Sequence, residues 1–410
     1  MPDRVPFDRR LVRGAVALVD SEDGLIPLRL TEESMQVLPD DWVRRCAKQT
    51  SGVRLALRTD ATRLELDVRV LRTLSVDGAG ARVGPLPQPG AFDLVVDGVF
   101  AGRAVAPEGA HHRLDFSTKR GSADTAPLST VVFDGLPGVD AEIEVWLPFE
   151  EITTLVALRA DGEVEPSRRQ QTRWVHHGSS ISQGVGARSG ASTWPAIAAR
   201  EAGLDLLNLG LAGNAVVDPF VARTLRDAPA DLISVKLGIN VVNHDVMRRR
   251  AFEPAVEGFL ATIRDGHPST PLVVVSPVLC PLLEDLPGPT YAAVTSDESR
   301  WYLTKGTEAE VAEGKLSLSV VREVLAEVVE RRRRLGDAQI WYVDGRTLYG
   351  EQDWAAHQLP DNLHPAAESH VSMGRAFAVE LMRLGLAAHV RDRVPASISC
   401  GGSPSVRDGR

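Results

Sequence analysis

The stretch WVHHGSSISQG, residues 174–184, is the most informative part of this chain. Its apolar start predicts a strand that ends at Gly178, and the small residues that follow predict a turn with Ser180 at its tip. Glycine lets the backbone bend with little steric hindrance, so a strand followed by such a turn can present a serine hydroxyl as a nucleophile. A single Gly-Ser-Ser turn is common, however, and by itself is more often a plain connection.

Three short segments downstream also place small or polar residues at the ends of apolar runs. Each has an ordinary structural explanation, because asparagine caps helices and both glycine and aspartate form turns. Together, four such segments favour a catalytic site over four unrelated turns. The three segments are NLGLAGN, which contains Gly213, LISVKLGIN, which ends at Asn240, and DNLHP, in which Asp361 precedes His364 by three residues.

In these segments the chain resembles the SGNH/GDSL hydrolase superfamily, over residues 172–388. In that family four blocks supply, in this order, a nucleophilic serine, an oxyanion-hole glycine, an oxyanion-hole asparagine and an Asp-x-x-His pair. The family usually has aspartate before the nucleophile, where this chain has Ser179; a subgroup is similar in having a small residue there. The serine is the third residue of its block, so the resemblance implies that Ser180, and not Ser179, is the nucleophile.

Chemistry explains why these residue types are needed. A serine hydroxyl is a poor nucleophile at neutral pH and needs a base, for which histidine is suited because its ordinary pKa is about 6.5. The resemblance implies that His364 is this base and that Asp361 orients it and stabilises its protonated form. The backbone N–H groups of Ser180 and Gly213 and the side-chain amide of Asn240 would form the oxyanion hole.

Other candidate site residues are weaker. His176 and His177 are adjacent on a predicted strand, so their side chains point to opposite faces; His177 and Ser179 are candidates for the pocket wall. The loop 184–190 resembles a phosphate loop but misses the dinucleotide spacing by one residue. The run Arg331–Arg334 is better explained as the solvated end of a helix than as an anion site. No metal-binding or nucleotide motif is present, which predicts no metal and no cofactor.

Composition narrows the class of protein. The chain has 410 residues and a formal net charge of -9, which argue for two domains and against a nucleic-acid partner or a basic membrane-binding surface. Its three cysteines are far apart and imply no disulfide framework. The N-terminus lacks the apolar region of a signal peptide, and no apolar run reaches the ~18 residues that span a membrane. We therefore expect a cytoplasmic protein.

The rhythm of apolar residues changes near residue 170. Residues 1–170 contain short segments that alternate every second residue, separated by Gly, Pro and Asp-Gly turns, and no long helical pattern. They predict an antiparallel β-sandwich of jelly-roll type. In residues 171–390 strands alternate with helices, which predicts a three-layer α/β/α domain with a parallel sheet and its site at the carboxyl ends of the strands. The polar tail 391–410 is expected to be disordered.

One long segment, residues 281–318, is an insertion between a predicted strand and a helix. Such insertions at the edge of an active site often form lids or substrate walls. A passive surface excursion is an equally good explanation.

The resemblance also implies a function. SGNH hydrolases with an N-terminal β-sandwich include carbohydrate esterases that remove acetyl groups. We therefore expect a serine esterase that removes a short acyl group from an O-acylated small molecule or carbohydrate, such as a sugar or a glycosylated small molecule. Two alternatives stay open: an acyltransferase that uses the same residues, and a carbohydrate-binding protein without catalytic activity.

Overall fold

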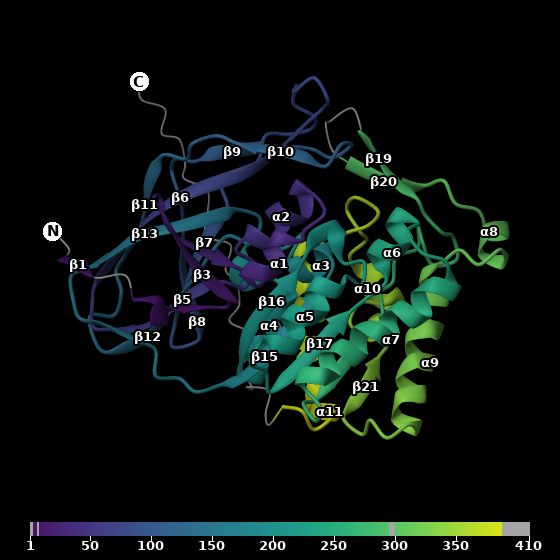
Figure 1. Cartoon of the computed structure of the whole chain (residues 1–410). Coiled ribbons are helices and arrows are strands. Elements are labelled where there is room, and N and C mark those ends of the chain that lie inside the picture. The colour runs from purple at the N-terminus through teal and green to yellow at the C-terminus, as the bar shows by residue number, and fades with distance from the viewer. Residues whose placement is uncertain (1–2, 6–7, 295–299, 388–410) are drawn as a thin grey trace, which may run out of the picture.

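The computed structural model describes residues 3–5, 8–294 and 300–387. Within these ranges a β-sandwich, formed by the first part of the chain, lies beside an α/β unit (Figure 1). The predicted fold class is therefore confirmed. The tail 391–410, which we expected to be disordered, lies outside the described residues.

The β-sandwich consists of two sheets whose inward side chains form a core of their own. One sheet has the strand order β10-β9-β6-β13-β4-β3, with β1 also on β13 and β11 also on β6; the other has the order β14-β5-β12-β7-β8, with β2 on β5. The pairs are antiparallel except for β6 and β9, which run parallel. The strands are β1 (Asp3–Val5), β2 (Val12–Arg13), β3 (Ala17–Ser21), β4 (Gly24–Leu28), β5 (Arg54–Thr59), β6 (Arg63–Val76), β7 (Ala91–Val96), β8 (Val99–Val105), β9 (Ala110–Asp115), β10 (Arg120–Ala123), β11 (Leu128–Asp134), β12 (Ala141–Trp146), β13 (Ile152–Ala160) and β14 (Val164–Pro166).

The α/β unit is built on a parallel sheet with the strand order β16-β15-β17-β18-β21. Its strands β17 and β18 are buried along their whole length, as expected for strands covered on both faces. The strands are β15 (Thr172–Gly178), β16 (Leu204–Gly210), β17 (Leu232–Lys236), β18 (Leu272–Val275) and β21 (Ile340–Val343).

Helices cover both faces of this sheet. Helices α4 and α11 pack together on one face, and α5, α7 and α9 pack on the other. The helices of the unit are α3 (Ser180–Gln183), α4 (Trp194–Ala202), α5 (Pro219–Asp227), α6 (Ile239–His244), α7 (Arg249–Gly266), α8 (Glu308–Ala312), α9 (Leu318–Arg334), α10 (Glu351–Ala356) and α11 (Ala367–Arg383).

The N-terminal half also contains two short helices that the sequence patterns did not predict, α1 (Glu32–Gln36) and α2 (Asp41–Lys48). The Asp40 carboxylate caps α2 by accepting a hydrogen bond of 2.9 Å from the backbone N–H of Val43. The buried side chains of α2, such as Val43 and Cys46, belong to the core of the α/β unit and not to that of the sandwich. Helix α2 therefore ties the two parts of the molecule together.

Buried polar contacts strengthen this junction. The Arg29 guanidinium, which is fully buried, donates hydrogen bonds to the carbonyl oxygens of Asn208 (3.0 Å) and Gly210 (2.5 Å) at the end of β16. The Ser51 hydroxyl donates to the carbonyl oxygen of Gln183, the last residue of α3, at 2.5 Å. Because these donors come from the N-terminal half, the sandwich helps to hold the loops at the carboxyl end of the parallel sheet.

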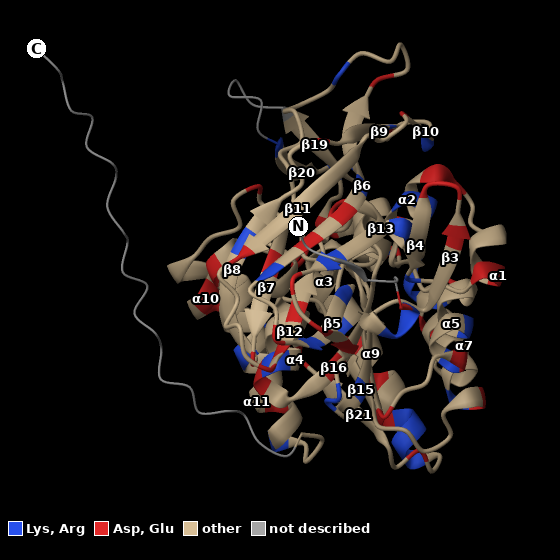
Figure 2. Cartoon of the chain, turned by 90° about the vertical axis from the view of Figure 1, so that its left-hand side faces the viewer, with Lys and Arg blue, Asp and Glu red and all other residues tan. Residues whose placement is uncertain are grey.

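The insertion 281–318 contains a β-hairpin, β19 (Thr290–Val294) and β20 (Arg300–Thr304), followed by α8. The hairpin lies near strands β6 and β9 of the sandwich in both views (Figures 1 and 2). Charges of both signs are interspersed over the two parts of the molecule (Figure 2). In the part of the chain that the structure describes, no helix combines the length and the apolar character needed to cross a membrane.

Candidate active site

The turn after β15 positions Ser180. The strand ends at Gly178, and α3 begins at Ser180. A Cβ atom on Gly178 would lie 2.3 Å from the Ser182 hydroxyl oxygen, so only glycine is accommodated at this bend. Helix α3 ends after one turn at Gly184, whose φ of 126° is unfavourable for other residues. Ser180 is thus the first residue of a short helix that lies between two conformationally restricted glycines, Gly178 and Gly184.

Ser180, His364 and Asp361 form a continuous chain of hydrogen bonds. The Ser180 Oγ atom lies 2.9 Å from His364 Nε2, and His364 Nδ1 lies 2.6 Å from Asp361 Oδ2. Because an ionised carboxylate only accepts hydrogen bonds, Nδ1 carries the proton, which leaves Nε2 to accept from the serine hydroxyl. This is the tautomer that a general base needs.

The Asp361 carboxylate is held in its ionised form. Burial alone would raise its pKa, but the hydrogen bond and charge of His364 and the backbone N–H groups of Leu363 and His364 lower it, and the net pKa is below the ordinary value. Those N–H groups donate to Oδ1 at 2.9 Å and 2.7 Å. Both carboxylate oxygens are therefore occupied, which fixes the carboxylate relative to the imidazole.

The predicted oxyanion residues lie at the ends of two neighbouring loops. Gly213 is in a short 3-10 turn after β16, and Asn240 is in the first turn of α6, after β17. The Asn240 Oδ1 atom accepts a hydrogen bond of 3.2 Å from the backbone N–H of Ala215, which ties the two loops together. This bond uses the carbonyl end of the Asn240 amide and leaves its NH₂ group as the donor.

The N-terminal half supports the loop that carries Gly213 from the outside. A Cβ atom on Gly213 would lie 2.6 Å from two ring atoms of Trp42 in α2. The Trp42 ring in turn packs edge-on against His244, whose Nε2 lies 2.9 Å from the Gly213 carbonyl oxygen. Neither Trp42 nor His244 was among the predicted site residues. The Asp40 cap and the spacing of apolar residues after it could have indicated the helix, but not its contact with Gly213.

Part of the insertion lies directly against the loop that carries Asp361 and His364. The Tyr302 ring packs edge-on against the His364 ring, with 5.7 Å between centroids. The backbone N–H of Tyr302 donates to the Asp361 carbonyl oxygen at 2.9 Å, and the Asn362 amide donates to the Tyr302 carbonyl oxygen at 2.9 Å. The hairpin therefore forms a wall of the site.

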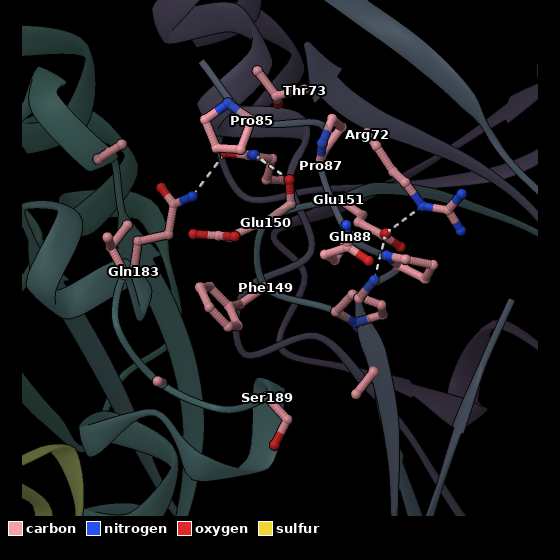
Figure 3. A pocket seen from close by; sticks show the side chains of 18 of the residues that line it. Arg72, Thr73, Pro85, Pro87, Gln88, Phe149, Glu150, Glu151, Gln183 and Ser189 are labelled. Carbon is pink, nitrogen blue, oxygen red and sulfur yellow. Dashed lines mark hydrogen bonds and ion pairs between the residues drawn. The ribbon is translucent and has the colours of Figure 1, made fainter. Parts of the chain in front are cut away.

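A pocket of about 710 Å³ lies between the sandwich and the α/β unit (Figure 3). Asp361 is among the residues that line it. The sandwich contributes Phe149, Glu150 and the proline-rich segment 85–89, and α3 contributes Gln183. The Glu150 side chain points toward Gln183 (Figure 3) and is exposed to the pocket. The pocket walls partly remove the Glu150 carboxylate from water and thereby raise its pKa, and the positive charges of Arg45 and His364 oppose this shift.

Two candidates for the pocket wall do not line it. His177 is fully buried: its Nδ1 lies 2.8 Å from the Leu209 carbonyl oxygen and its ring packs near Phe259 of α7. His176 points to the opposite face of the sheet, as expected. Ser179 is also fully buried, and its hydroxyl has no hydrogen-bond partner. The strand pleat directs His177 into the core, and the turn hides Ser179 beneath the nucleophile.

No cluster that could hold a metal ion occurs among the described residues, taking groups of three or more His, Cys, Asp or Glu side chains. The chemistry that the contacts among Ser180, His364 and Asp361 support is nucleophilic attack by the serine hydroxyl.

Comparisons with known proteins agree with this class. The profile of the GDSL-like lipase/acylhydrolase family matches residues 177–371, and that of the SsfX3 N-terminal domain matches residues 11–156. Among solved structures, the salicylyl-acyltransferase SsfX3 from a tetracycline biosynthetic pathway is 30% identical, with a TM-score of 0.73 over 94% of this chain and 98% of that chain. The chain belongs to the GDSL-like lipase/acylhydrolase family, and the resemblance seen in the sequence is confirmed.

More distant structures share the fold. A family two carbohydrate esterase from Clostridium thermocellum, in complex with cellohexaose, is 15% identical with a TM-score of 0.54, over 82% of this chain and 94% of that chain. The acetyl xylan esterase Est2A from the rumen bacterium Butyrivibrio proteoclasticus is 10% identical with a TM-score of 0.52, over 93% and 98% of the two chains. A search of curated proteins found no match.

Proposed function

We propose that this protein is a serine esterase that forms an acyl-enzyme on Ser180. The observation that carries the proposal is a pair of hydrogen bonds. One joins Ser180 Oγ to His364 Nε2 at 2.9 Å, and the other joins His364 Nδ1 to Asp361 Oδ2 at 2.6 Å. In the first step His364 Nε2 takes the proton of the Ser180 hydroxyl as the oxygen attacks the ester carbonyl. His364 then returns that proton to the leaving alcohol.

The oxyanion of the tetrahedral intermediate needs donors that are already in place. We assign this role to the backbone N–H groups of Ser180 and Gly213 and to the side-chain NH₂ of Asn240. The hydrogen bond that the Asn240 Oδ1 atom accepts from the backbone N–H of Ala215 keeps that NH₂ group in a fixed direction. Water, deprotonated by His364, then attacks the acyl-enzyme and releases the acid.

For the substrate, we propose an O-acylated small molecule or carbohydrate with a short acyl group. Family membership supports the ester bond, and the carbohydrate esterase and acetyl xylan esterase that share the fold support the alcohol portion. The pocket between the two parts of the molecule is polar as well as apolar, with carboxylate, guanidinium and amide groups in its wall, which suits a substrate with hydroxyl groups.

Acyl transfer to an alcohol is the second candidate, because the relative that is 30% identical is a salicylyl-acyltransferase. The same acyl-enzyme serves both reactions, and only the acceptor differs. Partitioning distinguishes them: the purified enzyme is given a 4-nitrophenyl ester with increasing concentrations of an alcohol. Formation of the new ester at millimolar alcohol, at the expense of free acid, would favour transfer; release of acid alone would favour hydrolysis.

The experiment that tests the proposal is labelling with a serine-directed fluorophosphonate, read by peptide mass spectrometry. Wild type is expected to carry one adduct, on Ser180. The adduct is lost in Ser180→Ala and forms much more slowly in His364→Ala. Ser179→Ala is the matched control and should label normally. Labelling of Ser179, or hydrolysis of short 4-nitrophenyl esters undiminished by Ser180→Ala, would overturn the proposal.

A further inference from the structure

Two arginines that line the pocket have no carboxylate partner among the described residues. Arg45 comes from α2 and Arg300 from the first position of β20. Neither forms an ion pair there, although most arginines of this chain do, with examples at Arg72, Arg188 and Arg322. A guanidinium is always charged in proteins, so an unpaired one in a pocket wall is a costly feature.

The two guanidinium groups are fixed by hydroxyl groups of a single strand face. One Arg45 nitrogen donates to the Thr73 hydroxyl at 2.7 Å, and one Arg300 nitrogen donates to the Ser75 hydroxyl at 2.8 Å. Thr73 and Ser75 are two residues apart in β6, so their side chains lie on the same face, whereas the intervening Leu74 lies on the opposite face and is buried. Both hydroxyls use their oxygen as acceptor, and their protons remain available.

The Arg45 side chain is held by protein contacts and has little contact with water. Arg45 is only 7% exposed, and its Nε atom is buried without a hydrogen-bond partner. The guanidinium carbons of Arg45 and Arg300 lie 6.0 Å and 5.9 Å from the centre of the Phe116 ring, which is also part of the pocket wall. The ammonium group of Lys119 lies 5.9 Å from the same ring. Three cations thus surround one aromatic side chain.

The carboxylates of the pocket wall are directed elsewhere. Glu151 receives hydrogen bonds from Arg72 and from the Gly90 N–H, and Asp361 is bonded to His364. Glu150 forms no ion pair with a described residue, and Figure 3 shows it pointing toward Gln183. The charge of Arg45 acts on Glu150, but among the described residues neither Arg45 nor Arg300 forms an ion pair with a carboxylate of the wall.

We propose that Arg45 and Arg300, together with the Thr73 and Ser75 hydroxyls, bind an anionic group of the substrate, a carboxylate or a phosphate. Guanidinium groups and hydroxyl donors in one pocket wall are a common way to hold such a group. This inference rests on the proposed esterase function and narrows its substrate class to esters that also carry an anion.

Strand β20 links the anion site to the histidine that contacts the reacting serine. Tyr302 follows Arg300 by two residues on β20, a distance of about 7 Å along a strand, and packs against His364. The same strand, β20, thus carries both the anion-binding side chain of Arg300 and the Tyr302 side chain that forms a wall of the catalytic site. The anion belongs either to the acyl portion or to the alcohol portion of the ester.

The test uses pairs of esters that differ only in the anion. For the acyl portion the pair is 4-nitrophenyl hexanoate and the 4-nitrophenyl monoester of adipic acid; for the alcohol portion it is 1-acetylglycerol and 1-acetylglycerol 3-phosphate. Wild type is expected to have at least a tenfold higher kcat/KM for the anionic member of one pair. That pair identifies which portion carries the anion, and added salt should reduce the preference.

Variants then locate the preference. Arg300→Gln and Arg45→Gln should each lower the ratio of kcat/KM for the anionic and the neutral ester about tenfold, mainly through KM of the anionic ester. The exposed Arg120→Gln is the matched control and should leave the ratio unchanged. A merely structural role of Arg300, joining the hairpin to β6, would reduce both esters equally. If Arg45→Gln fails to fold, Arg300→Gln decides.

Two results would overturn the inference. One is hydrolysis of the neutral esters with no anion preference in either pair; the other is a preference that both arginine variants retain. In either case labelling of Ser180 by the fluorophosphonate would show that the proposed esterase function still stands. Failure of that function is seen separately, as absence of labelling and of turnover with every ester.

Discussion

The two sides of the active-site cleft differ in how completely their polar groups are paired. On the side of the α/β unit, both oxygens of Asp361 and both ring nitrogens of His364 have partners within the site. On the side of the sandwich, the Glu150 carboxylate has no hydrogen-bond partner, and the guanidinium groups of Arg45 and Arg300 have no ion-pair partner, among the described residues. The first side is complete before a substrate arrives, whereas the second has groups that a substrate can pair with.

The difference separates chemistry from selectivity. A catalytic group must be held in its productive geometry in advance, so its hydrogen bonds are made within the protein. A recognition group gains specificity when its partner belongs to the ligand, because an analogue without that partner leaves it unpaired. We therefore expect changes on the first side to reduce turnover with all esters and changes on the second to reduce it only with some.

The largest effect is expected from Ser180→Ala. Removal of the nucleophile should lower kcat by about 10⁴-fold or more, for every ester alike, without changing the melting temperature appreciably. Ser179→Ala is the matched control: its hydroxyl contacts no partner, so kcat should stay within a few fold. Steady-state kinetics with a short 4-nitrophenyl ester measures both. Equal losses in the two variants would mean that the turn itself, rather than the Ser180 hydroxyl, is what matters.

The next effect concerns the oxyanion donors. Asn240→Ala removes one donor and should lower kcat by roughly 10²–10³-fold while KM changes little, because the donor acts on the transition state. It also removes the acceptor for the Ala215 N–H, so the protein should lose about 1 kcal/mol of stability. Kinetics and thermal unfolding of the same preparation check the two parts. A rise in KM with unchanged kcat would contradict the assigned role.

A smaller effect tests whether the two sides are coupled. Gly213→Ala places a Cβ atom 2.6 Å from the Trp42 ring, so the oxyanion loop or the ring must move. We expect kcat to fall about tenfold to a hundredfold, since small displacements of a catalytic donor are costly. In the Trp42→Leu background the same change should cost much less. The measurement is a double-mutant cycle; an equal cost in both backgrounds would show that Trp42 does not support the loop.

The smallest effect is on stability. Lys236, at the end of β17, is fully buried and its ammonium nitrogen has no hydrogen-bond partner. Burial lowers its pKa from 10.5 to about 7, and Arg322 adds to the shift, while Cys280 opposes it. Lys236→Met should therefore raise the free energy of unfolding at pH 7, by on the order of 2 kcal/mol.

The pH dependence has a definite sign. Between pH 7 and 10.5 the unfolded chain binds a proton at Lys236 that the folded protein does not. The wild type should thus gain stability from this residue as pH rises through that window, and the full cost is present below pH 7. Lys236→Met should lack this gain, so the advantage of the variant should shrink toward pH 10. Chemical denaturation at several pH values checks this, and a constant difference would contradict it.

The sequence predicted the first side of the cleft better than the second. Ser180, Gly213 and Asn240 each follow a strand of the parallel sheet, and such strands carry short, local signals: a continuous apolar run and then a glycine or asparagine. Asp361 and His364 are three residues apart, so one loop positions both. Local patterns were therefore sufficient to predict the fold class and to select these residues as candidates for one site.

The second side depends on contacts between distant parts of the chain. Helix α2 was missed because it is short and rich in charge, and its apolar side chains find their core in the other half of the molecule. Nothing local distinguishes Tyr302 or Arg300, whose positions follow from where the hairpin lies. His177 was a candidate for the pocket only because the direction of the strand pleat could not be read from sequence.

The most direct test of the proposed mechanism is to trap the acyl-enzyme on Ser180. Wild type is mixed with 4-nitrophenyl acetate, the reaction is quenched with acid within one turnover, and the peptides are analysed by mass spectrometry. We expect an acetyl group on Ser180, absent from Ser180→Ala and retained in Ser179→Ala. Turnover without any acylated peptide, or an acetyl group on a different residue, would contradict it.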